Sequence, residues 1–181
     1  IDNLAACGYH RAKRLLTYLQ TDERNATRLA SRVQPLLDAM PEHGLKLEVA
    51  KWSTLGRDVE WVEHLINNCW SSNWGFEPIG KAEARNLVLK VLMFLPTGVL
   101  SFVSLHGKPI ALSLGVPNAN EIASELNPRL GLLNLPQLFL RLRRCQCKHV
   151  RVALLGVIPD FQGSQLSLMA CIAMLRHLIN K

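Results

Sequence analysis

The sequence has few of the features that mark membrane-spanning or disulfide-stapled proteins. Its longest apolar run, residues 87–95, is interrupted by Lys90 and is too short to cross a bilayer. No secretory signal pattern opens the sequence, and its 5 cysteines are odd in number and lack framework spacing. We therefore expect reduced thiols, a cytoplasmic location and no membrane partner.

The sequence also lacks the paired ligand clusters of a zinc site. Cys145, Cys147 and His149 lie close together, but no complementary second pair accompanies them, so we expect no metal. Cys69 and Cys171 fall in helical patterns, where we interpret them as small apolar residues instead of nucleophiles. No Ser/His/Asp set has readable spacing, and the catalytic residues stay unassigned.

Acidic residues are outnumbered, because 21 Lys and Arg stand against 14 Asp and Glu and give a net charge of +7. This charge favours an anionic ligand, either nucleic acid or a phosphorylated cofactor. The most basic cluster, residues 141–149, contains no aromatic side chain. Single-strand binding surfaces need aromatics among the positive charges, so a nucleic-acid-binding module is only our third hypothesis.

What the sequence does contain is enough apolar residues, 49% of 181, to bury the core of one domain. Apolar periodicity predicts helices at residues 22–40, 58–70, 81–95, 121–126, 133–144 and from 163 or 164 onward. Alternation and β-rich composition predict strands at residues 45–50, 99–105, 109–116 and 149–157. A hairpin followed by strand, turn and helix indicates an α/β fold with a mixed sheet and helices on its faces.

Residues 154–167 are the most informative stretch. A strand ends at Pro159 and Asp160, a polar turn containing glycine follows, and apolar residues then recur at helical spacing from Leu166. Backbone N–H groups crowd together at such a turn, and the helix macrodipole points its positive end there. The stretch can therefore hold a phosphate group.

Residues 157–167 resemble the acyl-CoA signature of the GNAT N-acetyltransferase superfamily. The matching residues are Val157, Pro159, Phe161, Gln162 and Gly163. Gln165 and Ser167 depart from the signature, because glycine or alanine is usual at their positions. The order of elements over residues 45–178 resembles the first two-thirds of the GNAT fold.

The resemblance implies that an acyl-CoA, most often acetyl-CoA, is the co-substrate. Its pyrophosphate would lie on the turn amides, and its pantetheine arm would pair with the edge of the preceding strand. The residues implied to bind it are Leu155, Val157, Gln162, Gly163, Ser164, Gln165, Leu166 and Ser167.

The run at residues 67–76 resembles a segment of GNAT-like proteins that joins two helices and overhangs the acceptor side. Trp70, Trp74 and Phe76 offer apolar walls, and Asn73 offers orienting hydrogen bonds, which is the usual make-up of a small-molecule pocket. The alternative is that the two tryptophans fill the core. We predict that these four residues bind the acceptor.

The resemblance also predicts a domain division. Residues 1–20 would be the tail of a preceding GNAT-like lobe on which the rest packs, and residues 21–44 a linking helix. Residues 45–181 would form a GNAT-like domain without its closing strands.

The leading hypothesis is an N-acyltransferase that moves an acyl group from acyl-CoA to an amine of a small molecule or peptide by direct attack. The second hypothesis is a non-catalytic lobe with a structural or acyl-CoA-sensing role. It is kept because residues 149–157 contain no acidic residue, and the family's usual general acid comes from later strands.

Overall fold

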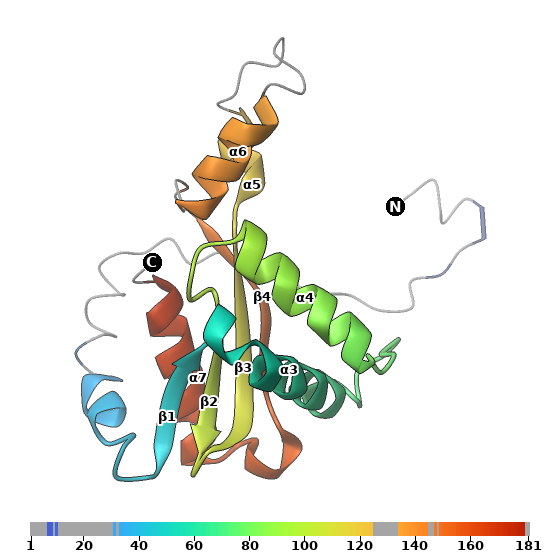
Figure 1. The fold of residues 1–181 in the computed structure, drawn as a ribbon. Helices are drawn as coiled ribbons and strands as arrows, with labels where there is room; N and C mark the ends of the chain where they lie inside the picture. Colours follow the sequence, from blue (N-terminus) through green and yellow to red (C-terminus); the bar gives the residue numbers. More distant parts are fainter. Residues whose placement is uncertain are drawn as a thin grey trace. The chain divides into compact units, whose positions relative to one another are not determined.

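The computed structural model describes residues 7–8, 10, 31, 33–124, 134–144, 147 and 149–179 (Figure 1). The chain divides into two units, Ile1–Arg32 and Val33–Lys181, and every element below belongs to the second. The predicted lobe tail, residues 1–20, lies outside the described residues except for 7–8 and 10. The predicted linking helix, residues 21–44, is described at 31 and from 33 onward, where 33–38 are helical and 39–44 form turns.

The second unit contains a sheet flanked by helices. Its elements are β1 (Leu45–Val49), η1 (Trp52–Thr54), α3 (Leu55–Cys69), α4 (Lys81–Phe94), β2 (Leu100–Leu105), β3 (Lys108–Pro117), α5 (Ala119–Ser124), α6 (Asn134–Arg143), β4 (Val150–Val157), η3 (Pro159–Phe161) and α7 (Gln165–Ile179). Each strand and helix predicted from residue 45 onward is present, with ends shifted by a few residues. Among the described helices, none is both long and apolar enough to cross a membrane.

The four described strands pair in the order β1-β2-β3-β4, and every neighbouring pair is antiparallel. The sequence predicts a mixed sheet, but the described strands show antiparallel pairing alone. The reason lies in the connection, because α3 and α4 are of similar length and return the chain to the end of β1. The N–H of Ala50, just after β1, donates to the carbonyl of Leu100 at 3.0 Å.

Both faces of the sheet are covered by helices (Figure 1). On one face, α3 and α4 pack their apolar residues, such as Val62 and Val88, around Phe102 and neighbouring strand residues. On the other face, α7 packs around Val103, the next residue of β2. Successive strand residues point to opposite faces, so a sheet covered on both sides has the nearly continuous runs of buried residues seen in β2 and β3.

A helical excursion, α5 and α6, separates β3 from β4. A hydrogen bond joins its two ends, because the N–H of Asn118 donates to the carbonyl of His149 at 3.0 Å. The side chain of Glu121 accepts from Asn118 Nδ2 at 2.8 Å and also contacts the His149 ring. The excursion therefore leaves and re-enters the sheet at one point.

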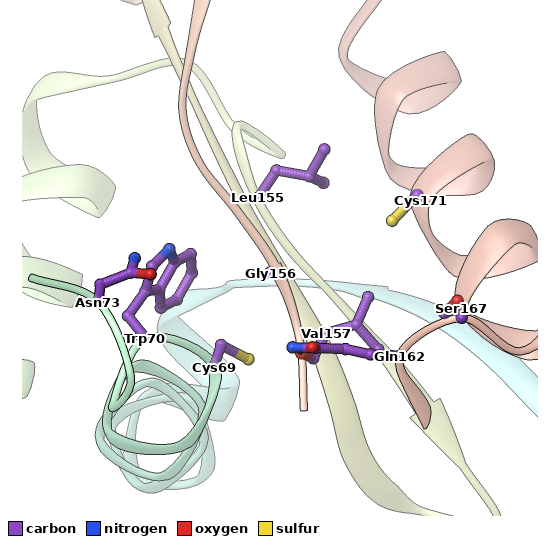
Figure 2. A pocket seen from close by; sticks show the side chains of 10 residues that line it. Cys69, Trp70, Asn73, Leu155, Gly156, Val157, Gln162, Ser167 and Cys171 are labelled. Carbon is purple, nitrogen blue, oxygen red and sulfur yellow. Dashed lines mark hydrogen bonds between the residues drawn. The ribbon is translucent and has the colours of Figure 1, made fainter. Parts of the chain in front are cut away.

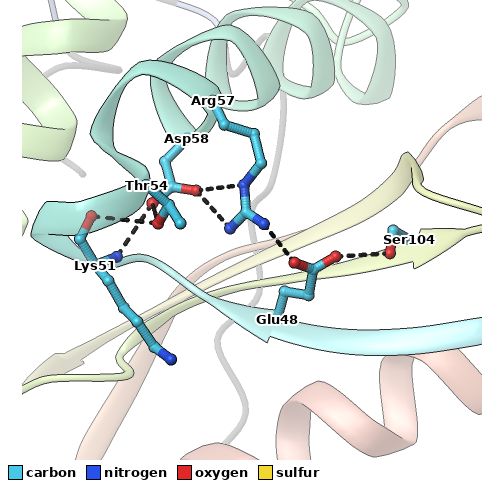
Figure 3. Close-up of polar contacts among 6 residues, drawn as sticks. All are labelled: Glu48, Lys51, Thr54, Arg57, Asp58 and Ser104. Carbon is cyan, nitrogen blue, oxygen red and sulfur yellow. Dashed lines mark hydrogen bonds and ion pairs between the residues drawn. The ribbon is translucent and has the colours of Figure 1, made fainter.

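A partly buried ionic network fixes the start of α3 (Figure 3). Asp58 is fully buried and accepts from the Lys51 N–H at 3.1 Å and the Thr54 hydroxyl at 2.7 Å. Arg57 donates two hydrogen bonds to the same carboxylate and one to Glu48 of β1. These contacts explain why the helix begins at Leu55, before the predicted start at residue 58.

The network also sets the ionisation of Arg57. Burial by itself would lower the pKa of the guanidinium, but the hydrogen bond and charge of Asp58, together with Glu48, outweigh it and raise the pKa above its ordinary value. Arg57 also lies 4.3 Å from the centre of the Trp61 ring. The network thus joins α3 to the sheet through a permanent positive charge.

Candidate functional site

A hollow of about 340 Å³ lies between the end of α3, the strand β4 and the start of α7 (Figure 2). The residues that line it are Cys69, Trp70, Asn73, Leu155, Gly156, Val157, Gln162, Gly163, Ser167 and Cys171. They come from the end of α3 and from the consecutive β4, turn and α7, two parts of the chain that are far apart in the sequence. The hollow therefore brings residues of both predicted sets to one place.

One wall of the hollow is the free edge of β4, the last strand in the described order. The N–H of Ile158 donates to the carbonyl of Ile110 on β3 at 3.0 Å. Because N–H and C=O groups alternate along a strand, those of Val157 and Leu155 point away from β3. The Val157 carbonyl instead accepts from the Gln162 side chain at 2.8 Å. β4 thus presents backbone groups to an extended ligand.

A second wall is the indole of Trp70, which packs against Gly156. A Cβ atom on Gly156 would lie 2.7 and 2.8 Å from ring carbons of Trp70 and 2.9 Å from the Cβ of Cys69. Glycine in a strand interior often marks such a close approach. The absent side chain lets the end of α3 lie directly on β4.

The turn before α7 forms the third wall, and it is built as the sequence predicts. Gly163 has a φ of 76°, a left-handed conformation that favours glycine. Ser164 caps the helix, because its hydroxyl accepts from the Ser167 N–H at 3.2 Å. The first amides of α7, those of Gln165 and Leu166, have no acceptor within the helix. The departure at Gln165 does not distort the turn, because α7 begins there without a positive φ.

β4 also carries an irregularity beside the hollow. Leu114 of β3 pairs with Leu154, but the next residue, Gly115, pairs with Val152. Ala153 is the extra residue between them and has no partner in the register. Such a bulge re-aims the strand and its neighbouring groups, and bulges occur often next to active sites.

Of the eight residues predicted to bind acyl-CoA, five line the hollow, and Ser164, Gln165 and Leu166 lie beside them in the turn and first helical residues. Of the four predicted acceptor residues, Trp70 and Asn73 line it, whereas Trp74 and Phe76 do not. The Trp74 side chain is 74% exposed. The two tryptophans of this loop therefore have different surroundings.

Three lining residues were absent from the predicted sets, namely Cys69, Gly156 and Cys171. The helical pattern predicts that the two cysteines are small apolar residues, and both are half-buried at the hollow. A signal for Cys171 existed, because it follows Ser167 by one helical turn and so shares its face. The signal for Gly156 was its place inside a β-rich run.

The thiols at the hollow are poorly suited to act as nucleophiles. Burial raises the pKa of Cys69 to about 12 and also raises the pKa of Cys171. Both thiols therefore stay protonated at neutral pH, and the thiolate is the reactive form. The described residues that line the hollow include no Asp, Glu, His, Lys or Arg. In the described ranges, no group of three metal-ligating side chains is placed to hold a metal ion.

These pKa shifts predict slow alkylation of Cys69. With iodoacetamide at pH 8, Cys69 should react far more slowly than the exposed Cys7. Because the pKa of Cys69 is raised, its rate should keep rising about tenfold for each pH unit between 7 and 9. Peptide mass spectrometry over time gives each rate, and equal rates at the two cysteines would contradict the burial of Cys69.

Comparison with known proteins gives two distant relatives, and no family model matches the chain. The chain is 28% identical over 158 residues to a protein named bacterial ceramide synthase from Caulobacter vibrioides (strain NA1000 / CB15N). It is 23% identical over 159 residues to Protein YghO from Escherichia coli (strain K12). These alignments cover 87% and 88% of this chain but 40% of each relative, so the chain spans less than half of their length.

Proposed function

We propose that this chain is the acyl-CoA-binding part of an N-acyltransferase. The observation that carries the proposal is the hollow in which the free edge of β4 meets the amides at the start of α7. A strand edge and a helix N-terminus are the two backbone features that suit an amide-containing arm with phosphates at one end. The similarity to a bacterial ceramide synthase over 87% of this chain adds support.

In this proposal the pyrophosphate lies on the turn from Gly163 to the first residues of α7. The unpartnered amides of Gln165 and Leu166 and the positive end of the helix macrodipole suit that charge. The pantetheine arm then runs along the outward-facing groups of Leu155 and Val157. An amide of the arm takes the place of the Gln162 side chain, which occupies the Val157 carbonyl in the structure.

The acyl carbonyl then lies beside β4 near the bulge at Ala153, and the amine enters from the side of Trp70 and Asn73. Its nitrogen attacks the thioester carbon, a C–N bond forms, the C–S bond breaks, and the proton lost by nitrogen passes to sulfur or solvent. The outward N–H of Leu155 is placed to stabilise the developing oxyanion. Holding both reactants in one hollow supplies the remaining acceleration through proximity.

The relative's name bears on the substrate class. A ceramide is the amide of a long-chain amino alcohol and a fatty acid, so its synthesis joins an acyl group to an amine. This chemistry favours an amine acceptor for this chain as well. The sequence resemblance favours acetyl-CoA as the acyl donor. The chemistry of ceramide synthesis adds fatty acyl-CoA to the donors that we propose.

A second candidate function is an acyl-CoA-binding lobe without catalysis. It is favoured by one observation, that the described residues lining the hollow include no carboxylate or imidazole to serve as a general base. Such a lobe binds acyl-CoA but leaves the thioester intact. Turnover therefore separates the two candidates.

The test is thioester turnover by the full chain with acetyl-CoA and palmitoyl-CoA, each offered a small polar amine and a long-chain amino alcohol. We expect release of the CoA thiol and formation of an amide with at least one pair. Binding of acyl-CoA without turnover would favour the second candidate. The absence of both binding and turnover would contradict both.

A matched pair of glycine variants tests the turn. Gly163 and Gly107 both have positive φ, 76° and 81°, and open space where a Cβ would lie. Replacing either with alanine should cost about 1 kcal/mol of unfolding free energy. Only Gly163→Ala should also weaken acyl-CoA binding, by about tenfold, because it shifts the turn amides. Equal affinities of the two variants would mean that the turn does not bind the cofactor.

A further inference from the structure

A patch of exposed apolar side chains lies away from the hollow, where η1, the end of α4 and α6 approach one another. We call Trp52, Met93, Phe94, Phe139 and Leu140 the apolar patch. Trp52 is 56% exposed and the other four are between 38% and 48% exposed. Large apolar side chains gathered in this way mark an interaction site more often than scattered ones do.

Contacts between the elements hold the patch together. The rings of Phe94 and Phe139 meet edge to face with centroids 5.8 Å apart. Arg143 donates from Nη1 to the carbonyl of Met93 at 2.6 Å, which ties α6 to the last turn of α4. Trp52 and Arg143 line one shared hollow of about 160 Å³. Trp52, Phe94 and Phe139 are therefore linked through Arg143 and the aromatic contact, and Met93 and Leu140 are the chain neighbours of the two phenylalanines.

The charges on the segments that carry the apolar patch have one sign. Lys51, Lys90 and Arg144 are exposed, and Lys90 precedes Phe94 by four residues, so the two share one face of α4. The segments that build the surface, residues 51–54, 88–94 and 134–144, contain no Asp or Glu. This surface therefore combines exposed aromatic rings with a basic rim.

We propose that the apolar patch and its basic rim dock the protein on the surface of a membrane that contains anionic lipids. Aromatic and aliphatic side chains enter the boundary between headgroups and acyl chains, and Lys and Arg side chains pair with the lipid phosphates. Docking on a membrane surface needs no spanning helix, so it is compatible with the absence of long apolar runs in the sequence. The sequence-based expectation of no membrane partner rested on that absence alone. The inference is independent of the acyltransferase proposal.

Vesicle co-sedimentation of the full chain tests the docking. Vesicles of phosphatidylcholine with phosphatidylglycerol should retain the protein at low salt, and vesicles of phosphatidylcholine alone should retain much less. The double variant Phe139→Ser and Leu140→Ser should lose at least tenfold in affinity. Leu168→Ser on α7, where Leu168 is 53% exposed, is the matched control and should bind as the wild type does.

Charge-reversal variants provide a second test of the docking. Arg144→Glu should weaken retention on the anionic vesicles severalfold, whereas Arg85→Glu, an exposed position near the start of α4, should change it little. Circular dichroism of each variant reports that the fold is retained. These side chains are exposed, so their replacement leaves the core intact.

Tryptophan fluorescence locates the contact. Brominated lipids should quench the wild type, and Trp52→Phe should remove most of the quenching, whereas Trp74→Phe should not. The proposal is overturned by no retention on anionic vesicles at low salt, or by equal retention of the Phe139→Ser and Leu140→Ser variant. A concentration-dependent dimer that this variant abolishes, without vesicle binding, would assign the patch to a second copy of the chain and overturn the proposal too.

Discussion

Replacing Gly156 with alanine should weaken acyl-CoA binding at least tenfold and lower the free energy of unfolding by about 1–3 kcal/mol. The new Cβ would lie within 2.9 Å of the Trp70 ring and of Cys69. The Trp70 ring is rigid, so its outer atoms cannot move aside while the rest of the side chain stays in place. The end of α3 must therefore move away from β4. That movement changes two walls of the hollow at once. Calorimetric titration and urea unfolding measure the two effects.

Gly115 supplies the control for this prediction. It also lies in a strand, and a Cβ there would come 2.7 Å from Leu178 and 3.2 Å from Val150. Gly115→Ala should therefore destabilise the fold through crowding, but it should leave acyl-CoA affinity unchanged because Gly115 does not line the hollow. If the two variants lose affinity equally, the contact of Trp70 with Gly156 does not shape the binding site.

Replacing Asp58 with alanine should cost about 2–3 kcal/mol of unfolding free energy, because Arg57 is one-third exposed and keeps its ion pair with Glu48. The substitution leaves Arg57 without its main partner and removes the acceptor for the Lys51 N–H and the Thr54 hydroxyl. Thr54 and Arg57 are only partly buried, so each adds a reduced desolvation penalty when it loses its partner. Urea unfolding followed by circular dichroism measures the change.

The control for Asp58 is an ion pair on the surface. Glu60 lies 3.3 Å from Lys81, and both side chains are about two-thirds exposed, at 65% and 66%. Glu60→Ala should change the unfolding free energy by less than about 1 kcal/mol, because exposed pairs contribute little. A similar loss in both variants would mean that the network around Asp58 does not hold α3 on the sheet.

The elements of this fold follow from local pattern, but the site depends on contacts that the pattern does not contain. The β-rich composition of β2 and β3 and the helical spacing after Gly163 are local properties, and these elements form where the sequence predicts them. Trp70 and Trp74 have similar local surroundings in the sequence. One packs on Gly156 of a distant strand, whereas the other is mostly exposed. Only the tertiary arrangement separates them.

The same reasoning applies to the cysteines and to the direction of the strands. The apolar helical spacing predicts that Cys171 is buried. Whether its side chain packs in the core or lines a hollow depends on where β4 ends. The mixed sheet is a prediction from the hairpin followed by strand, turn and helix. The paired helices α3 and α4 reverse the chain instead, and the described strands all pair antiparallel.

The central claim is that the hollow beside β4 binds an acyl-CoA. The most direct measurement is calorimetric titration of acetyl-CoA and palmitoyl-CoA into the full chain, with a thermal shift recorded in parallel. We predict one saturable site for at least one of them, and a rise in melting temperature because the ligand binds only the folded state. No heat of binding and no thermal shift up to about millimolar ligand would contradict the claim.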